Sequence, residues 1–337
     1  MVQAARHLAA AAATALILAA CSAGPTMAPE TTRPSTPASP AGSSTTLAGS
    51  STTSTTSSRP APAPSPSSAR TSPPAPSAPR AFRTTVVHHG ADHPDDLALD
   101  ASGALLYSDY TNGTISRLAP NGTVTVLHRG LAGPEGLVPL ADGTLIVAEE
   151  KTNRILSIAP GATTPRVLRV LPGTPTLVTC HQGVDGIAWD ATTSTVIVPD
   201  AVTGTIYRMS TDGASLTRLA GGFVHPVGAA VDEQGRVYVA DECGGDVWRL
   251  GSGGSRTRVA RASMPDDVAL DGHGNLIVTD VRHVNHDVRR WSLTTGRSTV
   301  LARAALVEPQ GLLVEPSGRI WIADDRADLI LLLTPVP

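Results

Sequence analysis

The sequence predicts an all-β fold made of six repeated four-stranded units, and three observations support this prediction. Six segments share a turn, a short apolar strand, a polar hairpin and a second apolar strand ending at or beside an acid: HPDDLALDASGALLYSD, GPEGLVPLADGTLIVAEE, GVDGIAWDATTSTVIVPD, HPVGAAVDEQGRVYVAD, MPDDVALDGHGNLIVTD and EPQGLLVEPSGRIWIAD. Their turns lie 39 to 50 residues apart, at Pro94, Pro134, Val184, Pro226, Pro265 and Pro309. Helical periodicity is absent. A period near forty with short strands is typical of β-propeller blades.

The first unit shows how each repeat provides four strands. We expect Leu97–Leu99 to be innermost, followed outward by Leu105–Tyr107, Ile115–Leu118 and Val124–Leu127. Tight polar turns that contain glycine separate these strands, as β-hairpins require. The inner strands are almost continuously apolar because both of their faces pack against neighbouring blades.

The sixth unit lacks an outer strand, and the segment before the first unit supplies one. After strands at 309–314, 320–323 and 329–333 the sixth unit has no fourth strand, but the segment RTTVVHHG at 83–90 resembles TVTVLHRG at 123–130. We therefore expect an N-terminal strand to complete the last blade. This closes a six-bladed propeller over residues 82–337 and leaves no exposed sheet edge.

The first 20 residues are expected to form a secretory signal peptide. Arg6 precedes an apolar run, Leu8–Ala20, of 13 residues, which is too short to span a bilayer. The run ends in Leu-Ala-Ala before Cys21 and resembles the lipobox of bacterial lipoproteins, so we expect a lipid on Cys21. A plain signal peptide with an incidental cysteine is the alternative. The predicted location is the outer face of the cytoplasmic membrane, reached through the lipid anchor only.

Residues 21–81 are expected to form a disordered tether. They are rich in Ser, Thr, Pro and Ala and contain almost no large apolar side chain, so they cannot bury enough surface to offset the entropy of ordering. The net charge of the whole chain is -3, which does not indicate a nucleic-acid partner. We expect a monomer that binds a small molecule or an envelope protein.

The chain has three cysteines, and two of them are predicted to pair. Cys180 precedes the inner strand of blade three, and Cys243 follows the second strand of blade four. In a propeller these two loops open on the same face of adjacent blades. We expect a Cys180–Cys243 disulfide, which would persist outside the cytoplasm.

The loops that enter the innermost strands should bring acidic side chains together around the channel. The first residue after each turn position is Asp95, Glu135, Asp185, Val227, Asp266 or Gln310. Carboxylates that converge on one axis repel each other, and Ca²⁺ or another divalent cation stabilises such oxygen-rich sites. Asp95, Glu135, Asp185 and Asp266 are therefore candidate metal ligands. The alternative is that these side chains cap local turns.

A second set of acids ends the second strand of every blade, and we interpret it as structural because it is present in all six: Asp109, Glu149, Asp200, Asp241, Asp280 and Asp324. Residues that break the repeat on the same face are better candidates for function: Glu150, His181, Gln182, His225, Glu242, His283 and His286. Nucleophile elbows, phosphate-binding loops and zinc-binding cysteine clusters are absent from the sequence.

The repeat resembles NHL-type repeats and the related gluconolactonase/senescence-marker-protein family. The resemblance covers the whole predicted propeller and rests on a Pro, an acid or small residue, Gly, an apolar strand, Asp, a Gly turn and a second apolar strand before Asp. It implies a single metal held at the entering turns by a glutamate, asparagines and an aspartate. Pro265-Asp266-Asp267 corresponds to the aspartate turn of the family, but none of the six positions holds asparagine.

Two functions from different classes follow. The first is an envelope-anchored propeller that binds a small molecule or a protein partner at its acidic channel face, with or without a structural divalent cation. The second is a metal-dependent hydrolase of lactones or esters. In the hydrolase, Asp267 is the candidate base that acts on water activated by the metal, and His225 is the second catalytic candidate. No organic cofactor is expected.

Overall fold

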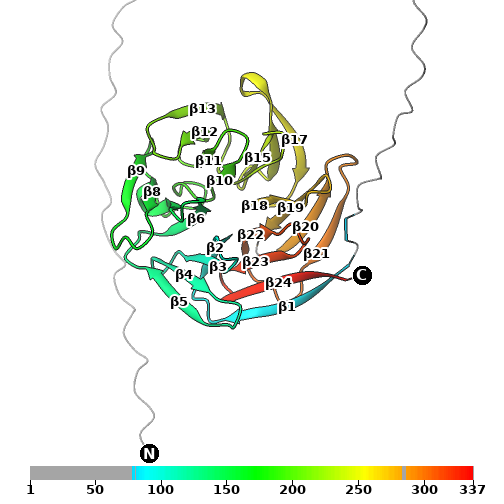
Figure 1. Cartoon of the computed structure of the whole chain (residues 1–337). Coiled ribbons are helices and arrows are strands. Elements are labelled where there is room, and N and C mark those ends of the chain that lie inside the picture. The colour runs from blue at the N-terminus through cyan, green and yellow to red at the C-terminus, as the bar shows by residue number, and fades with distance from the viewer. Residues whose placement is uncertain (1–77, 80, 283–285, 337) are drawn as a thin grey trace, which may run out of the picture. The chain divides into compact units, whose positions relative to one another are not determined.

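The computed structural model describes residues 78–79, 81–282 and 286–336. Within these ranges the chain forms six four-stranded antiparallel sheets, which follow one another around a central axis as the blades of a propeller (Figure 1). Two short 3₁₀ turns, η1 (Glu150–Thr152) and η2 (Ser252–Gly254), are the helical elements of this part of the chain. The predicted all-β, six-bladed fold is confirmed.

Blades one to three take their strands in chain order, from the axis outward. Blade one contains β2 (Pro94–Leu99), β3 (Leu105–Asp109), β4 (Thr114–Leu118) and β5 (Val124–His128). Blade two contains β6 (Pro134–Pro139), β7 (Leu145–Glu149), β8 (Arg154–Ile158) and β9 (Arg166–Val170). Blade three contains β10 (Ala188–Asp190), β11 (Thr195–Asp200), β12 (Thr205–Ser210) and β13 (Leu216–Gly221).

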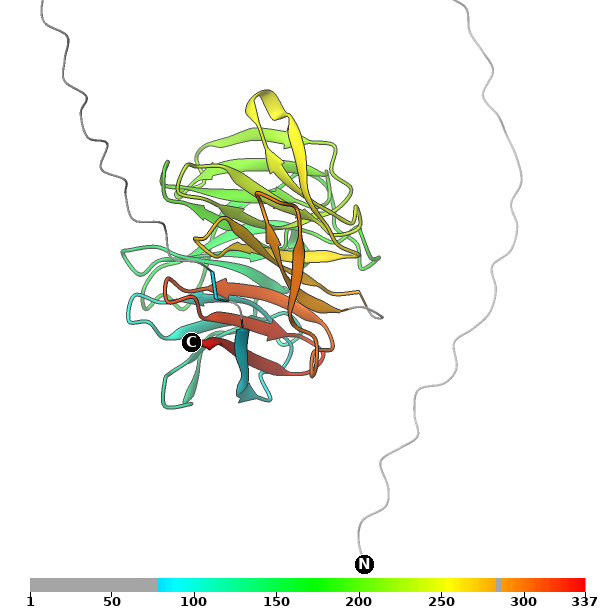
Figure 2. The ribbon, with the colours of Figure 1, turned by 90° about the vertical axis from the view of Figure 1, so that its right-hand side faces the viewer.

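Blades four and five repeat this order. Blade four contains β14 (Pro226–Val231), β15 (Val237–Asp241), β16 (Asp246–Leu250) and β17 (Arg256–Arg261). Blade five contains β18 (Pro265–Leu270), β19 (Asn275–Asp280), β20 (Asp287–Ser292) and β21 (Ser298–Ala302). In the side view of Figure 2 the strands of the blades twist relative to one another, as adjacent strands of L-residues do.

Blade six joins the two ends of the propeller. It contains β22 (Pro309–Val314), β23 (Ile320–Asp324), β24 (Leu329–Val336) and, as its outer strand, β1 (Ala81–His89). β1 runs antiparallel to β24, with register partners from Ala81↔Val336 to His89↔Leu329, and the two strands lie side by side in Figure 1. The predicted closure by an N-terminal strand is therefore confirmed.

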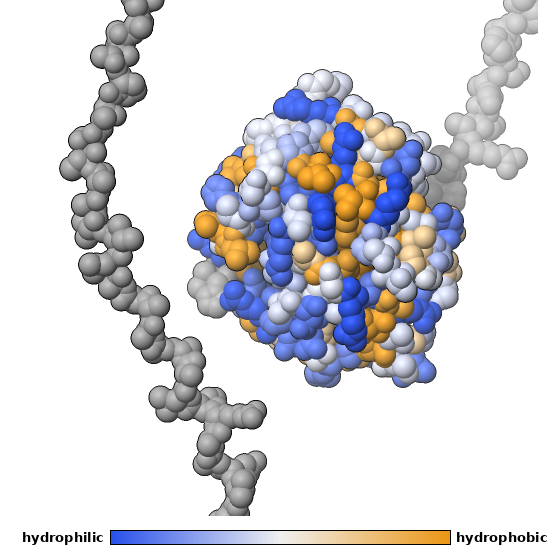
Figure 3. All heavy atoms as spheres, turned by 90° about the vertical axis from the view of Figure 1, so that its left-hand side faces the viewer, coloured by the Kyte–Doolittle hydropathy of each residue, from blue (hydrophilic) through white to orange (hydrophobic). Residues whose placement is uncertain are grey.

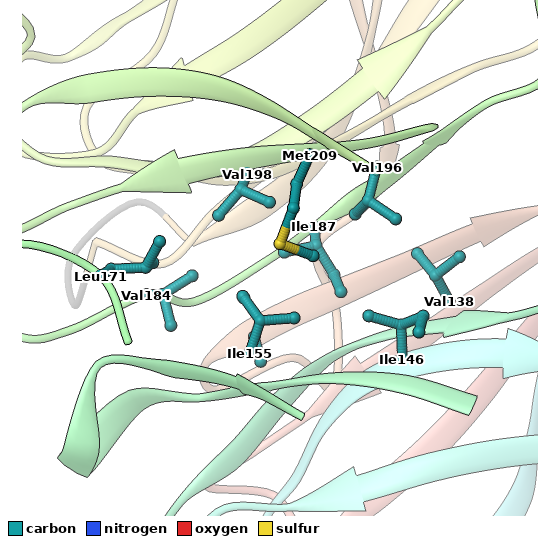
Figure 4. Packing of buried hydrophobic residues seen from close by; sticks show 10 residues of the cluster. Val138, Ile146, Ile155, Leu171, Val184, Ile187, Val196, Val198 and Met209 are labelled. Carbon is teal, nitrogen blue, oxygen red and sulfur yellow. The ribbon is translucent and has the colours of Figure 1, made fainter. Parts of the chain in front are cut away.

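The core lies between neighbouring blades. Figure 4 shows one such layer, in which Ile146 and Ile155 of blade two face Val196, Val198 and Met209 of blade three. All five side chains are fully buried, so each blade covers the apolar face of the next. The outer surface is mixed, and the side shown in Figure 3 alternates hydrophilic and hydrophobic stripes.

Asp241, Asp280 and Asp324, which end second strands, hold the loops that enter the inner strands of their blades. Asp241 accepts hydrogen bonds from the backbone N–H groups of Val224 and His225, at 3.0 and 2.7 Å. Asp280 and Asp324 accept equivalent bonds sixteen and seventeen residues earlier in the chain, from the pairs Ser263 with Met264 and Val307 with Glu308. These contacts support the structural interpretation of these three acids.

Several predictions fall on residues that the structure does not describe. The signal peptide over 1–20, Cys21, residues 21–77 of the tether and His283 lie outside the described residues. The described residues form no helix that is long and apolar enough to cross a membrane.

Candidate functional site

A cavity of about 380 Å³ opens at the face where the loops entering the inner strands meet those leaving the second strands. Eight carboxylates line it: Asp95, Glu135, Glu150, Asp185, Glu242, Asp266, Glu308 and Asp325. The basic lining residues are Arg326 and His225, and the Arg326 guanidinium already forms an ion pair with Glu308. Acidic residues therefore outnumber basic ones in the lining of the cavity by eight to two.

Three of the predicted metal ligands converge. Asp95, Glu135 and Asp185 each offer a carboxylate oxygen within 4.8 Å of the other two. They come from three consecutive blades, and Asp95 and Glu135 are only 7% and 5% exposed. Oε2 of Glu135 is buried without a hydrogen-bond partner among the described residues. Asp266 lines the same cavity but lies outside this group of three.

This donor set fits a hard divalent cation. Carboxylate oxygens are the ligands that Ca²⁺ prefers, and a buried carboxylate oxygen without a donor is costly unless a cation or a proton satisfies it. Asp95, Glu135 and Asp185 would hold the ion, and the cation would offset the repulsion between their charges.

His225 lies beside this cluster with one ring nitrogen already engaged. Its Nδ1 lies 2.8 Å from Oε2 of Glu242, and its Nε2 is buried without a hydrogen-bond partner in the part of the chain that the structure describes. The residue is 1% exposed and lines the cavity. A carboxylate on one nitrogen orients the imidazole and favours the tautomer in which the other nitrogen accepts a proton.

Asp267, the predicted base, does not join the other site residues. Its Oδ1 accepts the backbone N–H of Val268 at 2.7 Å, and its Oδ2 accepts that of Leu312 in blade six at 2.8 Å. It lines a second, largely apolar cavity formed by the inner strands themselves. Asp96 repeats this arrangement, bonding the N–H groups of Leu97 and, in blade two, Leu137. These two carboxylates connect adjacent blades.

Among the residues that break the repeat, Glu150, Gln182 and Glu242 line the acidic cavity with His225. Neither His181, which is exposed, nor His286 is among its lining residues. Sequence reasoning missed Glu308 and Asp325. Both had a signal, because Asp325 follows a strand-ending acid just as Glu150 and Glu242 do, and Glu308 aligns with His225.

The predicted disulfide is present and shapes the cavity wall. Cys180 and Cys243 are bonded across 63 residues, with their Cα atoms 5.9 Å apart. Thr179 and Gln182 on one side of the bond, and Glu242 on the other, line the cavity. The sulfur of Cys243 lies near His225 and Glu242, but as a disulfide it offers no thiolate to a metal.

Burial and mutual repulsion raise the pKa values of the clustered carboxyls. Burial, followed by the charge of Asp185, raises the pKa of Glu150 to about 7. Burial also raises the pKa of Asp185 to about 6. The pKa values of Asp95, Glu135 and Asp266 lie well above their ordinary values, first because of burial and then because of the charge of Asp185.

These shifts predict that the cation-free protein loses stability as the pH rises. A carboxyl whose pKa is raised by folding releases its proton at a lower pH in the unfolded chain than in the folded one. The free energy of unfolding therefore falls as the pH rises from the unfolded pKa of about 4 to the folded pKa. For Asp185 and Glu150 that window ends at about 6 and about 7. Thermal unfolding in a chelator should show a melting temperature that declines from pH 5 to pH 8, and Glu150→Gln should reduce the decline. A melting temperature that rises over this range would contradict the prediction.

This chain resembles known proteins in its fold. No protein-family model matches the sequence, and no curated protein matches it. A gluconolactonase from Xanthomonas campestris is 18% identical, with a TM-score of 0.61 over 76% of this chain and 90% of its own. The PQQ-bound aldose sugar dehydrogenase from Streptomyces coelicolor is 16% identical, with a TM-score of 0.59 over 76% and 99%.

Virginiamycin B lyase from Staphylococcus aureus is 17% identical, with a TM-score of 0.55 over 71% of this chain and 80% of its own. These similar structures include a lactonase, a dehydrogenase and a lyase. A similar fold at this sequence identity therefore does not indicate one activity. The predicted resemblance to gluconolactonase-like propellers is confirmed as a resemblance of fold.

Proposed function

We propose that this protein is a binding protein whose acidic cavity holds a divalent cation, such as Ca²⁺, together with a small molecule. The observation that carries the proposal is the convergence of Asp95, Glu135 and Asp185 within 4.8 Å, with Oε2 of Glu135 buried and unpartnered among the described residues. Three neighbouring carboxylates are destabilising on their own and become favourable when a cation lies between them. Asp266 adds a fourth carboxylate to the same cavity wall.

Calcium titration of the full-length chain tests this proposal. The protein is stripped with a chelator and titrated with Ca²⁺ by calorimetry, and the purified protein is analysed for bound metal. Glu135→Gln should weaken Ca²⁺ binding at least about tenfold, because it removes the charge of one of the three clustered ligands. Glu233→Gln is the matched control, since Glu233 is exposed and does not line the cavity. Metal-free protein that takes up neither Ca²⁺ nor Mg²⁺ nor Zn²⁺ would contradict the proposal.

A second function, hydrolysis of lactones or esters, is supported by one specific observation. His225 lines the cavity with Nδ1 held by Glu242 at 2.8 Å and Nε2 without a partner among the described residues. Such an imidazole can take a proton from water or a hydroxyl at Nε2. A cation held by Asp95, Glu135 and Asp185 would supply a Lewis acid in the same cavity. Asp267 is omitted from this proposal because both of its oxygens accept backbone hydrogen bonds.

A screen of lactones and esters tests the second function. Turnover that is lost on chelation, and reduced about a hundredfold or more in His225→Gln, would support it. Glutamine preserves a hydrogen-bonding group of similar reach, so the folded cavity should remain. Wild-type protein that binds Ca²⁺ and turns over none of the panel would remove the hydrolase and leave the binding function.

We propose further that the propeller is displayed outside the cytoplasmic membrane on a lipid anchor. The apolar run before Cys21 and the polar, proline-rich stretch after it support this location, and so does the Cys180–Cys243 disulfide, since disulfides persist outside the cytoplasm. Incorporation of labelled fatty acid into wild-type protein but not into Cys21→Ser would be the expected result. Equal labelling of both chains would contradict the anchor.

A further inference from the structure

The cavity contains more negative charge than one divalent cation can balance. Beyond Asp95, Glu135 and Asp185, five other carboxylates line it: Glu150, Glu242, Asp266, Glu308 and Asp325. Three of them have cationic or histidine partners, since Glu308 pairs with Arg326, Glu242 with His225, and Asp325 with His93 at 3.1 Å. Neither Glu150 nor Asp266 forms an ion pair within the described residues. A cation at the group of three therefore leaves two carboxyls of the same cavity without a partner of opposite charge.

Some buried acceptor oxygens in the cavity have no hydrogen-bond donor. Oε1 of Gln310 and, when no metal ion occupies the group of three, Oε2 of Glu135 are buried acceptors without a hydrogen-bond partner in the described ranges, and both residues line the cavity. A primary ammonium group offers three N–H donors and no acceptor. It can donate hydrogen bonds to both acceptors, and its positive charge complements the carboxylates that line the cavity.

The loops that bound the cavity also carry exposed apolar side chains. Leu177 and Val178 are 85% and 61% exposed, directly before the lining residue Thr179, and Val224 is 59% exposed, directly before His225. We call these three side chains the apolar rim. Hydrogen bonds between Thr176 and His181 close the first loop, and the Cys180–Cys243 disulfide ties it to blade four. The hydrogen bonds and the disulfide therefore restrain the loop that carries Leu177 and Val178, which adjoins the lining residue Thr179 in sequence.

We propose that this site takes an organic cation with an apolar portion: a primary amine enters the cavity, and its hydrocarbon part lies on the apolar rim. The proposal rests on the proposed binding function and names the class of its small molecule. Neither a metal ion nor a fully hydrated polycation requires the exposed Leu177 and Val178, whereas burial of apolar surface favours an amphiphilic amine. Anionic and neutral ligands are disfavoured because their binding leaves the acids unbalanced.

Calorimetric titration of the full-length chain with hexylamine, 1-hexanol and hexanoate tests the proposal, with and without saturating Ca²⁺. We expect hexylamine alone to bind measurably, and its affinity to fall as the salt concentration rises. Asp266→Asn should weaken hexylamine binding about tenfold by removing a carboxylate from the cavity. Leu177→Ser with Val178→Ser should weaken it about tenfold by removing apolar contact. Val170→Ser is the control, because Val170 is 65% exposed on the outer strand β9.

The outcomes separate this proposal from the one on which it rests. Binding of hexylamine that is reduced by both the cavity and the rim variants, and unchanged in Val170→Ser, supports the organic cation. Ca²⁺ binding without any hexylamine binding overturns it and leaves the calcium site. Equal binding of hexanol or hexanoate overturns it as well. Hexylamine binding that is insensitive to the rim variant overturns the assignment of the apolar portion. Thermal unfolding of each variant tests whether it is folded at the temperature of the titration.

Discussion

Replacement of both Cys180 and Cys243 by serine should lower the free energy of unfolding by about 4 kcal/mol, since a disulfide restricts the unfolded chain more as the loop it closes becomes longer. The bond joins residues 63 positions apart in two different blades. Leu177 and Val178, which lie shortly before Cys180, are exposed and therefore add little packing to this loop. Urea unfolding of the wild type and the double variant would measure the difference.

The same variant should also disturb the acidic cavity. Thr179, Gln182 and Asp185 lie on the segment that the disulfide anchors, and Glu242 adjoins its other end. Ca²⁺ binding should therefore weaken even where the variant is fully folded. Cys21→Ser is the control, because that cysteine takes no part in the bond. A loss of less than about 1 kcal/mol, with unchanged Ca²⁺ binding, would show that the loop is held by its other contacts.

Asp267→Ala should destabilise the propeller by about 2–6 kcal/mol, because it leaves two backbone N–H groups without acceptors and each costs about 1–3 kcal/mol. These groups belong to Val268 and, in the next blade, Leu312. The lost carboxylate thus removes a connection between blades five and six. Asp96→Ala should have a similar effect on blades one and two, since Asp96 bonds Leu97 and Leu137. Thermal or urea unfolding measures both.

A binding measurement separates this structural role from a catalytic one. Asp267→Ala, at temperatures where it is folded, should retain Ca²⁺ binding, because Asp267 does not line the acidic cavity. If the screen finds turnover, the variant should retain most of it. Complete loss of turnover in a variant of normal stability would restore Asp267 as the base.

The architecture followed from local patterns that recur. Six copies of one strand–hairpin–strand pattern imply six equivalent sheets, and the segment RTTVVHHG at 83–90 resembles an outer strand closely enough to place β1 on β24. Placement of the disulfide followed from the same repeat, since equivalent loops of a propeller open on one face. Both predictions depend on the spacing of the repeat and not on the orientation of any side chain.

The entering turns were harder to interpret because adjacent residues of a strand point to different sides. Asp266 and Asp267 are neighbours in sequence, yet the first lines the acidic cavity and the second lines the apolar one. The sequence of an acidic pair in a turn does not show whether its carboxylates bind a cation or accept hydrogen bonds from backbone N–H groups. The apolar rim shows a similar limit, because composition alone does not reveal that Leu177 and Val178 remain exposed.

The repeat therefore determined the number of blades, their closure and the face on which acids gather, because these depend on spacing and on the alternation of apolar strands with turns. Only the folded chain decided which acids share a cavity, since the group of Asp95, Glu135 and Asp185 joins residues up to 90 positions apart. It also decided the pairing of His225 with Glu242, seventeen residues away. Spacing in the repeat sets the face on which a side chain lies, but distances of a few ångströms between blades depend on how the blades pack.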